Sequence, residues 1–113
     1  MEKSIKEASA NMVRTIRESE VYRHYLECAD SLNSMPGVLD RVMELRAQTI
    51  DVYHGTDSDD FIEKSDHLAE LRDELQKIPE VDAFLEAEEE LVHTLQEVSG
   101  ELSRAIRLYI PYH

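Results

Sequence analysis

The sequence predicts an all-α protein, an elongated antiparallel bundle of about four to five helices with a long C-terminal helix. Apolar residues recur with the period of amphipathic helices along the 113-residue chain, and no segment alternates as a strand does. Pro36, Gly55 and Pro79 fall between these periodic segments. Hydrophobic residues make up 42% of the chain, which is enough for a core, so we expect a single domain over residues 1–113.

The first two predicted helices cover residues 4–17 and 19–33. Ser4, with Glu7 three residues later, has the form of an N-terminal capping box and starts the first helix. Ser19 is a good N-cap residue for the second. The sequence leaves open whether the chain breaks at Ser19 or continues as one helix. The apolar stripe of the first helix consists of Ile5, Ala8, Met12 and Ile16, with Val13 beside it.

Two further helices are expected over residues 36–54 and 58–77. The earlier one starts at Pro36, because proline fits the first turn of a helix and disrupts a helix interior. Gly55 ends it, and the polar turn of residues 56–60 contains ready N-cap residues for the next helix. Apolar residues then recur at helical spacing as far as the following proline.

The last predicted helix, residues 79–108, begins at Pro79 and has the most regular pattern. Its apolar positions follow one another at three and four residues, which makes a heptad seam of roughly 40 Å. Leu85, Val92 and Ile106 widen the apolar surface. Long helices with broad apolar faces in so small a chain favour a homodimer or another oligomer. The predicted oligomer or partner seam consists of Val81, Phe84, Glu88, Leu91, Leu95, Val98 and Leu102.

Glu88 occupies a seam position at which an apolar residue is expected. A polar residue there fixes the register or the choice of partner in some helical assemblies. A glutamate at the edge of a seam can instead keep its carboxylate in water. The sequence leaves both interpretations of Glu88 open.

The chain has a net charge of -13, and most of the excess acid lies in its second half. Residues 1–55 hold nine acids and seven bases, whereas residues 56–113 hold 16 acids and five bases. A solvated acidic helix face explains this distribution, with a surface for a basic partner and adaptation to high salt as alternatives. Phosphate is repelled by the overall charge, so direct nucleic-acid binding is disfavoured, although Arg14, Arg17 and Arg23 lie in the nearly neutral half.

Several classes of protein are disfavoured by what the sequence lacks. It has no phosphate-binding glycine loop, no nucleophile elbow and no His-Glu-x-x-His motif, so we expect no enzymatic activity. Cys28 is the single cysteine, which excludes an internal disulfide framework. No apolar run approaches the roughly 20 residues that span a bilayer, and the N-terminus has no signal-peptide core. We therefore expect a soluble cytoplasmic protein without a cofactor or a membrane partner.

Two groups of side chains have the helical spacing of metal ligands. Glu90 and His93 lie one turn apart, as in carboxylate-bridged sites of helical bundles, but a symmetric dimer must supply the remaining ligands. His24, Glu27 and Cys28 also share one helix face. Chance pairing in a Glu-rich helix and a small buried cysteine explain these patterns more simply. No metal is assigned, and a metal-binding bundle that uses Glu90 and His93 across a dimer stays the alternative function.

Two stretches of the chain resemble the signatures of a known family. Residues 18–27, ESEVYRHYLE, resemble the SExYxxYxxA stretch near the start of the YlbF/YmcA/YheA family of small helical regulators, with Leu32 and Pro36 following as they do there. Residues 78–91 are similar to the second signature, in which a proline and an apolar residue precede YLEAEEEL, here FLEAEEEL. The resemblance covers roughly residues 8–107.

The resemblance implies an all-α protein without enzymatic activity that forms a homodimer or a heteromer. Bacillus members of the family are cytoplasmic cell-fate regulators that affect sporulation, competence and biofilm formation, and that act on mRNA maturation through an endoribonuclease. The implied partners are a second copy, other regulators of the family or an RNA-processing complex. Some members bind an iron–sulfur cluster through cysteines near the C-terminus, but Cys28 is the only cysteine here, so cluster binding is not inferred.

Overall fold

The computed structural model describes residues 1–54 and 61–106, and every regular element in these ranges is an α-helix. The predicted all-α class with a long C-terminal helix is confirmed. Three sequence predictions lie outside the described residues: the Gly55 stop, the capping turn with the start of the fourth helix at 58–60, and residues 107 and 108 of the last helix. The helices are α1 (Lys3–Arg17), α2 (Glu20–Asn33), α3 (Pro36–His54), α4 (Phe61–Gln76) and α5 (Pro79–Ala105).

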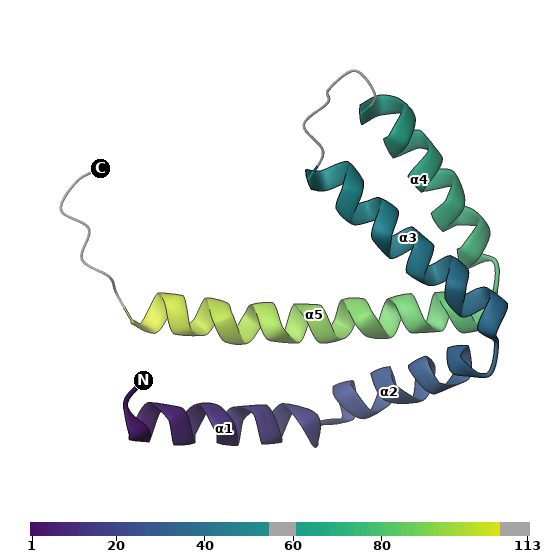
Figure 1. The fold of residues 1–113 in the computed structure, drawn as a ribbon. Helices are drawn as coiled ribbons and strands as arrows, with labels where there is room; N and C mark the ends of the chain where they lie inside the picture. The colour runs from purple at the N-terminus through teal and green to yellow at the C-terminus, as the bar shows by residue number, and fades with distance from the viewer. Residues whose placement is uncertain (55–60, 107–113) are drawn as a thin grey trace.

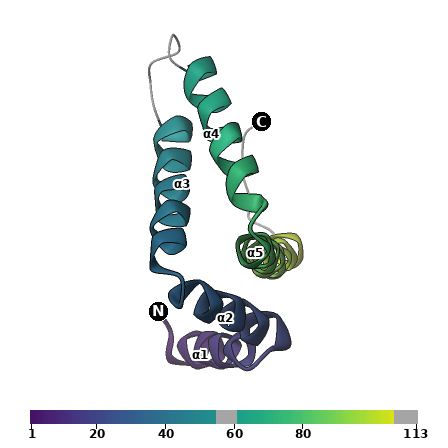
Figure 2. The same ribbon diagram turned by 90° about the vertical axis from the view of Figure 1, so that its right-hand side faces the viewer.

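The five helices form two arms that meet at the beginning of α5 (Figure 1). In one arm α2 packs antiparallel against the first half of α5, and in the other α3 packs antiparallel against α4. The two antiparallel pairs are splayed rather than wrapped around one axis, as the rotated view shows (Figure 2). The Cα radius of gyration is 18.4 Å, whereas a compact domain of 113 residues has about 13 Å. The chain alone is therefore too open to cover all its apolar surface.

The hydrophobic core lies where the two arms meet. Leu32 of α2, Leu75 of α4 and Val81 of α5 are completely buried there. The ring of Tyr25 packs on the ring of Phe84 with their centroids 5.5 Å apart, which ties α2 to α5. Helix α1 contributes no buried residue, so α1 and the second half of α5 extend beyond the core. The other buried members of this cluster are Cys28, Val42, Leu45 and Ala87.

The structure resolves the question of continuity at Ser19. This residue has an extended backbone, with φ -74° and ψ 157°, and it separates α1 from α2. Its Oγ accepts a hydrogen bond from the backbone N–H of Tyr22 at 3.2 Å, which satisfies one of the free amides at the start of α2. The two helices are therefore distinct, as the capping chemistry of Ser19 indicates.

Two helix ends differ from the approximate ends that the sequence predicts. The Ser4 capping box does not form, because α1 already begins at Lys3 and the Lys6 N–H bonds the Glu2 carbonyl oxygen at 2.9 Å, leaving Ser4 inside the helix. At the other end of the chain, α5 stops at Ala105. The next residue, Ile106, has φ -110° and ψ 99°, which is an extended conformation, so Ile106 lies outside the helix in which the sequence predicts it.

We expect Ser19→Ala to lower the free energy of unfolding by about 1 kcal/mol, because alanine has no oxygen to accept the Tyr22 N–H. Urea denaturation followed by circular dichroism measures this loss. Ser4→Ala is the matched control, since Ser4 lies within α1 and caps no helix. Equal losses for the two variants would show that the Ser19 hydroxyl is not the cap that separates α1 from α2.

Candidate protein–protein interface

The predicted seam of α5 divides into a buried half and an exposed half. Val81 and Phe84 belong to the hydrophobic core, where they hold α5 to the rest of the chain. Leu95 is 45% exposed and Leu102 is 57% exposed, which is unusual for seam leucines of a helix with a partner. The part of the seam that remains for a partner consists of the exposed Leu95 and Leu102 with the half-buried Leu91 and Val98.

Helix α1 presents a second apolar surface. Its stripe has the same spacing as a core-facing helix, yet Ile5 is 50% exposed, Met12 45% and Val13 51%. An isolated helix of 15 residues is only marginally stable in water, so burial of this stripe against another helix would stabilise it. In Figure 1, α1 runs beside the second half of α5 in the opposite chain direction. The two apolar surfaces therefore belong to the same arm.

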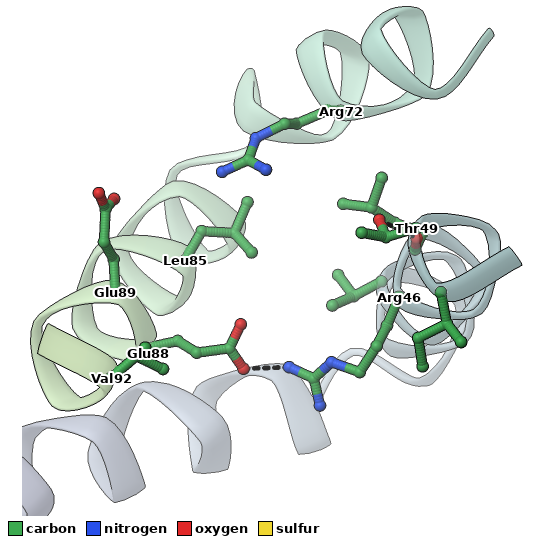
Figure 3. Close-up of a pocket in the computed structure, with 10 residues that line it drawn as sticks. Arg46, Thr49, Arg72, Leu85, Glu88, Glu89 and Val92 are labelled. Carbon is green, nitrogen blue, oxygen red and sulfur yellow. Dashed lines mark hydrogen bonds and ion pairs between the residues drawn. The ribbon is translucent and has the colours of Figure 1, made fainter. Parts of the chain in front are cut away.

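Glu88 lies beside the seam and has a partner within the chain. Its Oε2 forms an ion pair with Arg46 Nη2, which links α5 to α3 across a hollow (Figure 3). This hollow has a volume of about 360 Å³, lies between α3, α4 and α5, and has Leu85 and Arg72 on its wall. Sequence reasoning missed Arg46 and Arg72, because no local pattern indicates that α3 and α4 face α5.

His93, one of the two candidate metal ligands on α5, pairs with an acid other than Glu90. His93 Nδ1 lies 2.8 Å from Glu97 Oε1, one turn further along the helix. His24 and His93 line one hollow between α2 and α5, and Glu90 is also on its wall. Within residues 1–54 and 61–106, no three His, Cys, Asp or Glu side chains are arranged to hold a metal ion. A metal site shared across a dimer stays a prediction.

The second candidate group contains a buried thiol. Cys28 lies in the hydrophobic core, and its Sγ is 3.9 Å from His24 Nε2. Burial raises the pKa of the Cys28 thiol, and the nearby Glu27 carboxylate raises it further. A raised pKa favours the neutral thiol, which is a poor nucleophile and a poor metal ligand. These features fit a small core residue.

The arginines considered for nucleic-acid contact all lie on the surface. Arg14 and Arg17 are exposed on α1, and Arg23 is exposed on α2. Arg14 Nη2 donates a hydrogen bond to Asn11 Oδ1 at 3.0 Å. Arg14 and Arg17 lie on the helix that also has the exposed apolar stripe, so their charge is available to a protein partner as well.

These features define a small all-α protein in which α1 and the second half of α5 expose apolar surface. A family model described as control of competence regulator ComK, YlbF/YmcA, matches residues 5–107. The chain belongs to this family of regulatory proteins, as its two sequence signatures indicate. Comparisons with curated proteins and with solved structures gave no match. In the part of the chain that the structure describes, no helix is long and apolar enough to cross a membrane.

Proposed function

We propose that this chain is a non-catalytic cytoplasmic regulatory or adaptor protein that acts by associating with other proteins through its helices. The observation that carries the proposal is the exposed apolar surface of α1 and the second half of α5, which includes Met12, Leu95 and Leu102. Contiguous apolar rows on a small protein are typical of interaction sites. Burial of such surface stabilises a complex by roughly 25 cal/mol for each Å² removed from water.

Two kinds of partner fit this surface. A second copy is the simplest, because a twofold contact uses the same surface of each chain and buries both stripes at once. Other helical regulators of the family are the second, since the exposed rows have the three- and four-residue spacing that any amphipathic helix can match. Membership of a family of competence regulators supports a regulatory outcome, and the resemblance adds an RNA-processing complex as a target.

Affinity purification of the tagged chain from its native host tests this function. We expect specific proteins to be retained and to survive ribonuclease treatment, because the exposed rows bind protein rather than RNA. The matched sample is the tagged Leu95→Arg variant, which places a charge in the exposed half of the seam. Retention of proteins only while RNA is intact, or equal retention by the variant, would contradict the proposal.

A further inference from the structure

Helix α1 is basic although the protein is strongly acidic. It contains four Lys or Arg residues and a single acid, Glu7. Helix α5 contains eight acidic residues and one arginine, Arg104. Helices α1 and α5 therefore have charges of opposite sign, which favours their contact and disfavours contact between two α1 helices or two α5 helices.

The charges also have a definite position relative to the rows on α1. Residues that directly follow the row residues lie on one flank of a helix, and residues that directly precede them lie on the other. In α1 the following flank has Lys6 after Ile5 and Arg17 after Ile16. The preceding flank of α1 has no base and consists of Ser4, Glu7, Asn11 and Thr15.

The second half of α5 has the opposite arrangement. Its preceding flank is acidic, since Glu90, Glu97 and Glu101 come directly before Leu91, Val98 and Leu102. Its following flank has no acidic or basic residue and consists of Val92, Gln96, Ser99 and Ser103. Beside the rows, α1 thus has bases on its following flank only, and the second half of α5 has acids on its preceding flank only.

The relative direction of two paired helices decides which flanks meet. In a parallel pair, the following flank of one helix faces the preceding flank of the other, whereas in an antiparallel pair like flanks face each other. Parallel packing of α1 on α5 therefore sets bases against acids. Within one chain α1 and α5 run in opposite directions, so the complementary pairing is not available there (Figure 1). A twofold axis perpendicular to the helices makes α1 parallel to α5 of a second copy.

We infer that the chain forms a homodimer in which α1 packs in parallel on the second half of α5 of a second copy, with Lys6 and Arg17 facing Glu90 and Glu101. This inference rests on the proposed function and names its partner. Lys6 and Arg17 are 11 residues apart, as are Glu90 and Glu101, so one register satisfies both pairs. Because the dimer is twofold symmetric, this contact between α1 and α5 occurs twice.

The same register also aligns the exposed apolar residues. Flank residues that face each other in a parallel pair are about five residues apart in level, so this register sets Ile5 within one residue of Leu95 and Met12 within one residue of Leu102. These are among the large hydrophobic side chains that the single chain leaves exposed on the two helices. Burial of the rows supplies most of the affinity, and the flanking charges fix the direction and the choice of partner.

Charge exchange tests the pairing. Lys6→Glu with Arg17→Glu should weaken the homodimer roughly tenfold or more, because four exposed ion pairs per dimer become repulsive. Glu90→Lys with Glu101→Lys should weaken it similarly. A mixture of the two double variants should form a heterodimer of near wild-type affinity, since both of its contacts are complementary again. Sedimentation equilibrium measures each dissociation constant.

The control reverses the same two charges on the far side of α1, by Lys3→Glu with Arg14→Glu, and should leave the dissociation constant within about threefold of wild type. If the Lys6 and Arg17 variant weakens the dimer no more than this control does, or if mixing restores nothing, the inferred pairing is overturned while a dimer formed through the apolar rows is retained. A wild-type chain that stays monomeric throughout would overturn homodimerisation itself.

Discussion

Leu32→Ala is expected to lower the free energy of unfolding by about 3 kcal/mol, a large share of the roughly 5–15 kcal/mol that keeps a small domain folded. Leu32 is completely buried in the cluster to which α2, α3, α4 and α5 all contribute. Alanine at this position leaves a cavity that the surrounding helices fill only in part. Because this cluster lies at the meeting point of the arms, the loss weakens the contact of both arms at once.

Chemical denaturation at one fixed protein concentration measures the effect, because association adds to the apparent stability. The matched control is Leu26→Ala, the same substitution on the same helix at a residue that is 43% exposed. We expect a loss under about 1 kcal/mol there, since much of that side chain stays in water after folding and its removal leaves no closed cavity. Equal losses at the two positions would mean that the core is not centred where the arms meet.

The local elements of this fold could be predicted because local chemistry decides them. Pro36 and Pro79 are the first residues of α3 and α5, as expected from the fixed φ of proline and its missing N–H. Ser19 separates α1 from α2, and its side chain accepts a hydrogen bond from the backbone N–H of Tyr22, three residues later. The Ser4 prediction failed for a related reason, since a capping pattern indicates a start only where the preceding backbone is not already helical.

The division of the seam could not be predicted from the sequence. Phe84 and Leu95 both occupy seam positions of the heptad pattern, yet Phe84 is 6% exposed and Leu95 is 45% exposed. A periodic row records which face of a helix is apolar, and it does not record whether the chain itself or another molecule covers that face. The two halves of the α5 seam differ because α2 is shorter than α5 and packs along its first half alone.

Glu88 illustrates the same limit for polar residues. Its position in the seam indicated either a role in partner choice or a solvated carboxylate. In the structure its carboxylate pairs with Arg46, which is 42 residues away in the sequence. The pairing depends on the angle at which α3 leaves α2, which no residue near Glu88 determines. The charged flanks of α1 and α5, by contrast, depend on the sequence of each helix alone. They can therefore be predicted once the apolar row of each helix has been identified.

Leu95→Arg is expected to raise the dissociation constant of the dimer by about 100-fold or more. In the proposed dimer the side chain of residue 95 is buried in an apolar row, and a guanidinium there loses water without gaining a charged partner. Twofold symmetry places the substitution in the interface twice. Light scattering after size exclusion should change from twice the 13.1 kDa mass of one chain to the single-chain mass. Gln96→Arg is the control, because it adds the same charge one residue further round α5, on the uncharged flank.

The same variant connects association to the folding of α1. No α1 side chain is buried within its own chain, so dissociation should leave this 15-residue helix with little more stability than an isolated peptide. Hydrogen exchange should then become fast at the α1 amides of Leu95→Arg, while the amides of α2 around Leu32 stay protected by the core. If the variant is monomeric and its α1 amides stay protected from exchange, α1 is held by α5 of its own chain. In that case only half of the proposed surface is available to a partner. If α1 loses protection as the dimer dissociates, the basic helix folds on the second copy that it binds, and association and local folding are one event.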